Sequence, residues 1–357
     1  MHMQIRQLKE QALNLLQQLI ATPSFSREES ASATLIENFI QDQGLKARRK
    51  FNNLWICNQY YSAAKPTLLL NSHHDTVRPN HGWSMNPFQP VIQDGKLFGL
   101  GSNDAAASLV SLLVAFLYHH KRKDMKYNII FSATGEEESS GEQGIRAILD
   151  DIGSIDLAIV GEPTGMQLAI AEKGLLVLRC KAKGISGHAA RDVGKNAILC
   201  ALQDIQWFST YKFPLVSDLL GPVKMTVTMI EGGIQHNVIP GSCQFTVDIR
   251  ITDCYNADEV LVIIRQNISA EITSCSLNLR ASYIADDHEF VGCARKLGIL
   301  TFGSPTLSDR TFIAAPSVKI GPGESERSHT ANEFVFLSEI EQGIETYIRL
   351  LDTFVSP

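Results

Sequence analysis

Several short apolar segments of this 357-residue chain end in side chains that can bind a metal or move a proton. These are His73 and Asp75 after TLLLNS (67–72), Glu136, Glu137 and Glu138 after NIIFS (128–132), and Glu162 after DLAIV (156–160). Each apolar segment has the length and composition of a buried strand. In an open parallel sheet, ligands bind beyond the carboxyl ends of the strands, so we expect these side chains to converge.

Two further residues extend this set. Asp104 opens the apolar helix AAASLVSLLVAFLYHH (105–120), where a carboxylate would be a natural N-cap. His329 follows the glycine-rich turn GPG. Each residue alone is more simply explained as a helix cap, a turn residue or part of a solvated acidic loop. Together, two histidines and three carboxylates form a nitrogen and oxygen ligand set suited to zinc.

The segment NSHHDTV predicts how one ligand is oriented. In an extended chain, His73 and Asp75 point to one side and His74 to the other. Asp75 could then accept a hydrogen bond from one nitrogen of His73 while the other nitrogen binds the metal.

Composition excludes several classes of partner. A net charge of −6 and a pI near 5.9 argue against nucleic acid or an anionic membrane, so the substrate is expected to be a small molecule. The seven cysteines are scattered and never in a C-x-x-C pattern, which indicates reduced thiols. The amphipathic N-terminus does not resemble a signal peptide, and no apolar run approaches the ~20 residues of a membrane span. We therefore expect a soluble, cytoplasmic protein.

Helices alternate with short apolar strands, which predicts an α/β fold with a mostly parallel sheet flanked by helices. Residues 173–284 differ: strands and helices follow the order β-α-β-β-α-β, with a capping box at Asn256 and Glu259 and a last strand at SLNLRASYI (276–284). This order predicts a ferredoxin-like α+β domain inserted into a catalytic domain formed by 1–172 and 285–357.

The chain resembles the metallopeptidase family of acetylornithine deacetylase, succinyl-diaminopimelate desuccinylase, aminoacylase and carboxypeptidase G over its whole length. The matching segments are LLQQLIATPSFSREE, NSHHDTV, FGLGSND, ATGEEESSGEQG, VGEPTG, KGISGHAA, HNVIPGSCQFTVDIR and GPGESERSHTANEF. Within that family it is most similar to the acetylornithine, acetylcitrulline and succinylornithine deacylases of arginine biosynthesis. The resemblance implies a zinc-peptidase-like fold whose inserted domain serves as lid and dimerisation domain.

The resemblance also implies a role for individual residues. His73 and Glu162 would bind one zinc, Glu138 and His329 a second, and Asp104 would bridge the two ions, for which cobalt could substitute. Asp75 would orient His73, and Glu137 would be the general base. The inserted domain would supply His188 as an oxyanion donor, reaching the partner's active site in a homodimer. Arg250, Asn237 and the turn from Gly321 to Gly323 would bind the substrate carboxylate.

Two positions depart from the family pattern. Ala106 stands where a lysine is usual, two residues after the bridging aspartate, but that lysine is not a ligand. The acidic pair usually follows an aspartate, whereas here Gly135 precedes three glutamates. Counting back from Gly144 and Ile145, which should begin the next helix, favours Glu137 as base and Glu138 as ligand. The shifted pair, Glu136 as base and Glu137 as ligand, stays open.

We therefore expect a metal-dependent amidohydrolase that removes an acetyl or succinyl group from ornithine or a related amino acid. A dipeptidase or aminoacylase of the same fold and a non-catalytic metal-binding protein are alternatives, although the latter has no use for Glu137. A nucleotide-binding protein is disfavoured because neither G-x-G-x-x-G nor G-x-x-x-x-G-K-[ST] occurs. A succinyl group would call for a further cation, for which Arg191, Lys195 and Arg310 are candidates.

Overall fold

The apolar segments of the chain form the middle of a largely parallel sheet in a computed structural model, which describes residues 2–191, 193–275 and 279–357. The strand order is β1-β2-β6-β3-β7-β17-β8, and β6, β3, β7 and β17 pair in parallel. The strands are β1 (Arg48–Lys50), β2 (Asn53–Cys57), β3 (Thr67–His73), β6 (Asn128–Thr134), β7 (Leu157–Gly161), β8 (Leu168–Glu172) and β17 (Ser317–Ile320). This architecture confirms the predicted fold class.

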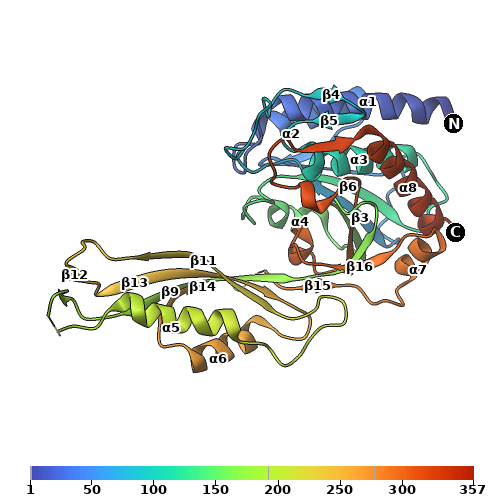
Figure 1. Ribbon diagram of the computed structural model, residues 1–357. Coiled ribbons are helices and arrows are strands. Elements are labelled where there is room, and N and C mark those ends of the chain that lie inside the picture. The colour runs from blue at the N-terminus through green and yellow to red at the C-terminus, as the bar shows by residue number, and fades with distance from the viewer. Residues whose placement is uncertain (1, 192, 276–278) are drawn as a thin grey trace. The chain divides into compact units, whose positions relative to one another are not determined.

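Both faces of the middle of this sheet are covered, which explains why β3, β6 and β7 are rich in apolar residues and buried along their whole length. Along β3, Leu68 and Leu70 pack into the core formed with the long helices, whereas Leu69 packs into a second core on the opposite face. The long helices are α1 (His2–Ala21), α2 (Ser30–Asp42), α3 (Ala107–His119), α7 (Glu289–Lys296) and α8 (Leu337–Val355). The elements of the second core are η2 (Ile145–Ala147), α4 (Leu149–Ile152) and η3 (Asp309–Phe312). Figure 1 shows α3 and α8 side by side.

A small antiparallel sheet carries the chain into the loop before α3. Its strands are β4 (Val91–Gln93), β5 (Lys96–Phe98) and β18 (Phe334–Phe336). The chain then passes through a single helical turn, η1 (Ser102–Ala106), before α3 begins. A further short turn, η4 (Ser325–Arg327), precedes His329.

The chain divides into two units, and the second is an insertion in the first. The first unit comprises the described residues up to Ile170 together with 284–302 and 308–357, and the second comprises 171–283 and 303–307. The predicted borders lie at 172/173 and 284/285, and the prediction assigns 303–307 to the catalytic domain. No helix in the described ranges is long and apolar enough to cross a membrane.

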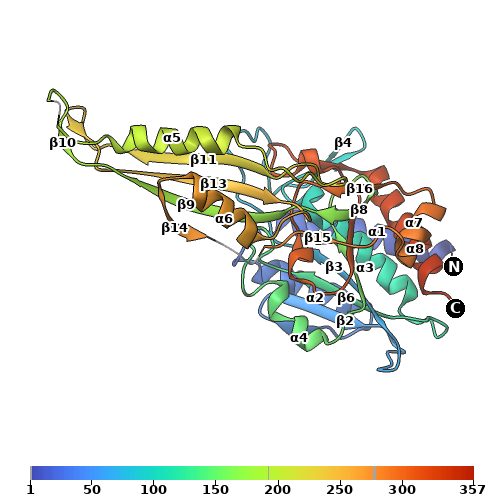
Figure 2. The same cartoon turned by 90° about the horizontal axis from the view of Figure 1, so that it is seen from below.

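The second unit contains a four-stranded antiparallel sheet in the order β11-β13-β9-β14, with α5 and α6 on one face (Figures 1 and 2). Its elements are β9 (Gly174–Lys183), β10 (Gly187–His188), α5 (Ala197–Thr210), β11 (Lys224–Gly232), β12 (Val238–Ile239), β13 (Ser242–Ile251), α6 (Ala257–Asn267), β14 (Glu271–Cys275) and β15 (Ser282–Tyr283); β16 is Thr301–Ser304. The predicted order β-α-β-β-α-β is confirmed, as is the capping box of Asn256 and Glu259.

One local expectation was wrong. The last strand of the second sheet is β14 (Glu271–Cys275), immediately before the predicted SLNLRASYI. Of that segment, 276–278 lie outside the described residues, and Ser282 and Tyr283 pair with Glu172 and Ala171 instead. The expectation that Gly144 and Ile145 begin the next helix is confirmed: the 3-10 helix η2 starts at Ile145 and the short α-helix α4 follows at Leu149.

Candidate metal centre

His73 ends β3 and is buried, with its two ring nitrogens facing different carboxylates. Its Nδ1 lies 3.0 Å from the carbonyl oxygen of Asp75 and 3.4 Å from Asp75 Oδ1. Its Nε2 lies 3.3 Å from Asp104 Oδ1 and 3.7 Å from Glu162 Oε1. The two ring nitrogens therefore face different groups, as expected. Asp75 lies at Nδ1, and the carboxylates of Asp104 and Glu162 lie at Nε2.

Asp104 does not cap α3, contrary to the sequence-based expectation. It lies inside the turn η1 with non-helical backbone angles (φ −119°, ψ 97°), and α3 begins only at Ala107 without a side-chain cap. The carboxylate instead faces two histidines, because Oδ1 lies 3.3 Å from His73 Nε2 and Oδ2 lies 3.6 Å from His329 Nε2. Asp104 therefore stands between two potential ligand groups.

Two glycines allow this approach of the chain. Gly101 has φ +76°, and a β-carbon there would come within 2.6 Å of Thr76 Cγ2. At Gly99, with φ +150°, a β-carbon would come within 2.2 Å of Ile20 Cγ2. The G-L-G sequence before Asp104 is thus required by close packing and by backbone conformation.

The three glutamates after β6 point in different directions. The amides of Glu137 and Glu138 donate to Asp75 Oδ1 and Oδ2 at 3.1 and 3.2 Å. Glu138 lies beside His329, whose Nε2 is 2.9 Å from Glu138 Oε2. Glu136 has φ +55° and accepts a hydrogen bond from the Gln143 amide instead. The pair that faces the histidines is therefore Glu137 and Glu138.

Two groups of these side chains are close enough to hold an ion among the described residues. The ligand atoms of His73, Asp104 and Glu138 lie within 4.8 Å of one another, and so do those of His73, Glu137 and Glu162. Glu162 Oε1 is buried and has no hydrogen-bond partner in the described part of the chain. Because a buried carboxylate oxygen without a partner is costly, this atom fits a bound cation.

Burial and crowding raise the pKa values of Glu137, Glu138 and Glu162 at this site. Burial and the charges of Asp104 and Glu138 raise the pKa of Glu162 to about 8. Burial also raises the pKa of Glu137 well above its usual value, with a further contribution from the charge of Glu162. Burial alone would lower the pKa of His73, but the charge of Glu162 and the hydrogen bond with Asp104 hold it well above its usual value. A divalent cation would neutralise this accumulated negative charge.

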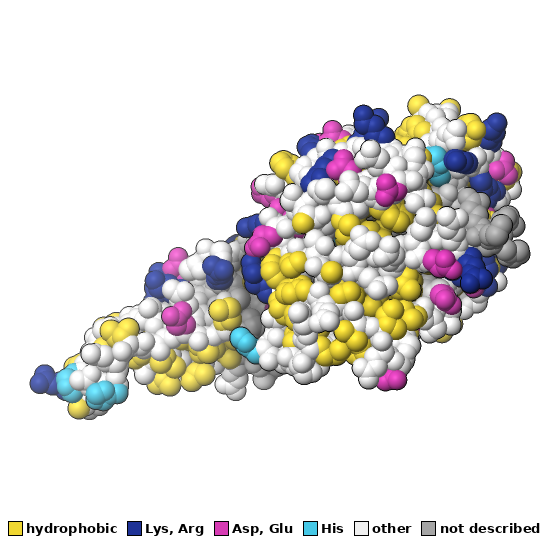
Figure 3. Space-filling model, turned by 90° about the horizontal axis from the view of Figure 1, so that it is seen from above, with side chains coloured by type: hydrophobic (Ala, Val, Ile, Leu, Met, Phe, Trp, Pro, Cys, Tyr) yellow, Lys and Arg dark blue, Asp and Glu magenta, His cyan; other side chains and the backbone are white. Residues whose placement is uncertain are grey.

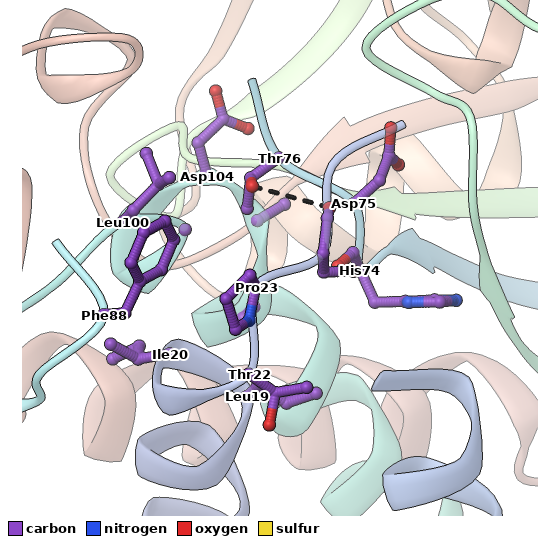
Figure 4. A pocket seen from close by; sticks show the side chains of 14 residues that line it. Leu19, Ile20, Thr22, Pro23, His74, Asp75, Thr76, Phe88, Leu100 and Asp104 are labelled. Atoms are coloured by element: carbon purple, nitrogen blue, oxygen red, sulfur yellow. Dashed lines mark hydrogen bonds between the residues drawn. The ribbon is translucent and has the colours of Figure 1, made fainter. Parts of the chain in front are cut away.

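Asp75 and Asp104 line a small cavity together with apolar side chains. A cavity of about 10 Å³, room for about one water, is lined by residues of α1, the segment after β3 and η1. Figure 4 shows the carboxylates of Asp75 and Asp104 directed away from Leu19, Ile20 and Phe88. The two carboxylates therefore point away from the apolar side chains that line this cavity.

Gly321 and Gly323, expected to bind substrate, lie where the chain after β17 approaches the Glu162 segment. A β-carbon on Gly321 would come within 2.4 Å of the Glu162 carbonyl oxygen, and one on Gly323 within 2.3 Å of Asn103 Oδ1. The Thr164 amide donates to the Gly321 carbonyl at 3.2 Å. In the structure these glycines hold the Glu162 loop in place.

The second unit carries the other expected substrate contacts. His188 and Asn237 are exposed on the neighbouring segments of the β10–β12 ribbon, where the Ala189 amide donates to the Asn237 carbonyl at 3.0 Å. Arg250 lies apart from them on β13 and makes a two-pronged ion pair with Asp248, with distances of 2.8 and 3.0 Å. Its fork-shaped donor group is thus already engaged by a carboxylate.

One candidate cation for a succinyl group was wrong. Arg310 is fully buried and donates to the backbone carbonyls of Ala169, Ile170 and Ser317, so it holds the chain together in the first unit. Arg191 and Lys195 are exposed in the second unit.

Three buried acids near the site escaped the sequence analysis. Glu29 accepts hydrogen bonds from the amides of Arg27 and Glu136, and Asp309 accepts from Asn71 and Thr134. Glu333 accepts from the amide of Asp104. Most of these partners are backbone amides, which carry no signature in the sequence. An acid next to an apolar strand, as Glu333 is, was the only available signal.

The fold and the residues at its strand ends are those of a hydrolase built around a candidate metal site. The sequence profile of the peptidase family M20/M25/M40 matches residues 69–353, and the chain belongs to this family.

Similar proteins cover nearly the whole chain at low identity. A succinyl-diaminopimelate desuccinylase of Delftia acidovorans is 25% identical, over 95% of this chain and 97% of its own length. An acetylornithine deacetylase of Proteus mirabilis is 27% identical over 96% of both chains. The crystal structure of a dinuclear metal binding peptidase of family M20 from Bacillus subtilis has a TM-score of 0.69 at 14% identity, over 97% of this chain and 98% of the other.

Proposed function

We propose that this protein is a zinc-dependent deacylase that removes an acetyl or succinyl group from the amino nitrogen of ornithine or a related amino acid of arginine biosynthesis. The observation that carries the proposal is the placement of Asp104 between His73 and His329, beside the Glu162 oxygen that accepts no hydrogen bond from the described residues. The names of the relatives, a deacetylase and a desuccinylase of N-acyl amino acids, support the substrate class.

Two zinc ions would fit the arrangement of the ligands. His73 and Glu162 would hold one ion, Glu138 and His329 the other, and Asp104, which faces both histidines, would be shared between them. Such ions would lower the pKa of a water and polarise the amide carbonyl of the substrate.

Glu137 would move the proton in the reaction. It is buried close to His73 and Glu162, and burial raises its pKa well above the usual value of a glutamate. A carboxylate beside the reacting water can carry the proton in such a reaction. As the water oxygen bonds to the acyl carbon, Glu137 takes a proton. When the carbon–nitrogen bond breaks, Glu137 gives that proton to the departing amine. The products are a carboxylate and a free amino acid.

His188 would stabilise the oxyanion, with Arg250 and Asn237 at the substrate carboxylate. The Nδ1 atom of His188 accepts a hydrogen bond from the Ala190 amide at 3.1 Å, which leaves the ring proton of the neutral form on Nε2. An oxyanion requires such an N–H donor.

We further propose a homodimer formed through the second unit. β11 is an edge strand of its sheet, and its Met229 and Ile230 side chains are 67% and 54% exposed. Figure 3 shows hydrophobic side chains gathered along one side of this unit. An open strand edge with exposed apolar residues suits pairing with a second copy.

The seven free thiols suit a reducing compartment such as the cytoplasm.

A peptidase is the second candidate, favoured by the similar fold of the Bacillus subtilis enzyme. A panel of substrates distinguishes the two: N-acetyl and N-succinyl ornithine, citrulline and lysine, N-succinyl-diaminopimelate, and dipeptides. We expect hydrolysis of one of the acyl amino acids, its loss on chelation, and its recovery with zinc or cobalt. Full activity in metal-free protein, or turnover of dipeptides alone, would contradict the proposal.

A further inference from the structure

We propose that Glu333 is a positioning residue that aims the Asp104 carboxylate at the metal ions by binding the backbone of the segment that carries it. This inference rests on the proposed metal site. Its basis is a set of contacts between Glu333 and the chain from Gly99 to Asp104.

Glu333 is placed at the start of this segment by the small sheet. β18 pairs antiparallel with β5, with Phe334 opposite Phe98. Immediately before β18, the Glu333 carbonyl accepts a hydrogen bond from the Gly99 amide at 3.0 Å. The side chain is 2% exposed. Glu333 is therefore anchored where β5 ends and the approach to Asp104 begins.

The Glu333 carboxylate collects three backbone amides of this segment. Oε2 accepts from Gly101 at 3.1 Å, and Oε1 accepts from Asn103 at 2.8 Å and from Asp104 at 2.9 Å. Burial and the charge of Asp104 raise the pKa of Glu333 to about 8, whereas these three amide hydrogen bonds lower it and so favour the ionised group. Three hydrogen bonds to one buried carboxyl group fix the backbone of the segment, and with it the position from which the Asp104 side chain starts.

This arrangement explains why Asp104 is free to face the histidines. Amides at the start of a helix need acceptors, and a local aspartate usually provides one through its own side chain. Here Glu333 supplies the acceptor from a distant part of the chain, and neither η1 nor α3 has a side-chain cap of its own. The Asp104 oxygens are thus left for His73 and His329.

The same short segment also carries a metal ligand. His329 is four residues before Glu333, and its Nε2 lies 3.6 Å from Asp104 Oδ2. One piece of chain therefore supplies a histidine on one side of Asp104 and binds the Asp104 backbone on the other. Loss of the Glu333 carboxylate should disturb the ligand that both ions share.

The test is metal affinity, measured in the whole protein by competition with a chromophoric zinc chelator. We expect Glu333→Gln, which replaces an acceptor oxygen by a donor, to bind zinc about 10- to 100-fold more weakly, the range seen when groups that orient metal ligands are lost. The visible spectrum of the cobalt-loaded variant should change as well. In activity assays kcat should fall more than KM rises.

Asp204→Asn is a matched control. Asp204 is also a buried carboxylate that accepts from two backbone amides, those of Ser269 and Ala270, but it lies in the second unit. It should lower the unfolding temperature and leave zinc affinity and the cobalt spectrum unchanged. If Glu333→Gln behaves in the same way, Glu333 serves stability alone and the inference is overturned.

The outcomes separate this inference from the proposed function. If the wild-type protein binds no zinc, the proposed metal site itself fails. If the wild type binds zinc and Glu333→Gln binds it equally well, only the role of Glu333 fails. Should Glu333→Gln not fold, Glu333→Asp is titrated instead. This variant keeps the carboxylate but shortens the side chain by one methylene. Weaker zinc binding would support the role of Glu333, and unchanged zinc binding would overturn it.

Discussion

Asp75 Oδ1 accepts a hydrogen bond from the backbone amide of Glu137 at 3.1 Å. Because the same carboxylate lies 3.4 Å from His73 Nδ1, it connects the segment after β3 to the acidic loop after β6. The relative placement of the candidate ligand His73 and the proposed base is therefore set by one buried side chain. The two glutamates that Asp75 holds differ in what they face, which leads to the first prediction.

Glu137→Gln should keep both metals and lose on the order of 10²-fold or more in turnover, because it removes the proton shuttle without removing a ligand. Glu138→Gln should lose metal, since Glu138 faces His329. Metal content and kcat are measured on the same preparations. Glu136→Gln is the control and should resemble the wild type. Loss of metal in Glu137→Gln together with full metal in Glu138→Gln would make Glu136 the base.

Arg250→Ala should raise KM for acyl amino acids by about 10-fold or more, the value of a charge-assisted hydrogen bond to a carboxylate. Asp248→Asn should not raise it, because that change only releases the guanidinium from its present partner. Steady-state kinetics with a substrate analogue that lacks the α-carboxylate provides the comparison. Equal losses on both substrates would assign Arg250 to structure alone.

His188→Ala should lose roughly 10² to 10³-fold in turnover with both metals still bound, as for the loss of one oxyanion donor. Mixing this variant with Glu137→Gln under conditions that exchange subunits tests whether His188 acts across a dimer. Some mixed dimers then contain one site with an intact Glu137 and an intact His188 from the partner subunit. Activity should rise well above either variant. A mixture that stays inactive would rule out the action in trans.

Stability should fall as the pH drops below about 6.5, with His74 as one cause. Burial lowers the pKa of His74 from its usual value, and its contacts with Ser32 Oγ and the Asn52 carbonyl suit a neutral ring. The unfolded chain then binds a proton that the folded chain does not. The free energy of unfolding should decline by up to ~1.4 kcal/mol per pH unit between the usual pKa and the lowered one.

Denaturant titrations of wild type and His74→Gln between pH 7.5 and 5 measure this slope. The variant should be less stable at pH 7.5 and show a shallower decline. Parallel slopes for the two proteins would show that His74 does not contribute to the pH dependence.

The strands of the first unit could be predicted because both of their faces are buried. An apolar run such as 67–72 has few alternatives, and β3, β6 and β7 begin within a residue of the predicted positions. The second unit's last strand could not be located in the same way. β14 (Glu271–Cys275) is polar and largely exposed, and its place in the sheet comes from pairing with β9.

The roles of individual acids were harder to predict from sequence. Asp104 has the sequence context of a helix cap. Only the hydrogen bond from the Asp104 amide to Glu333 shows that Glu333 is the residue that accepts from the amides there. Arg310 resembles a free cation in the sequence but is buried against carbonyl groups. In both examples the deciding partner lies far away along the chain, where no local pattern can reveal it.

The pairing of Ala171 with Tyr283 has a consequence for how the chain folds. The parallel ladder between β7 and β17 must bring Ala158 beside Ser317, with the whole inserted unit between them. Closing a loop of that length while it is disordered carries an entropic cost that grows with the logarithm of its length. Once the inserted unit has folded, its two ends are already neighbours, and the effective loop is short. Early folding of the insertion would therefore speed completion of the larger sheet.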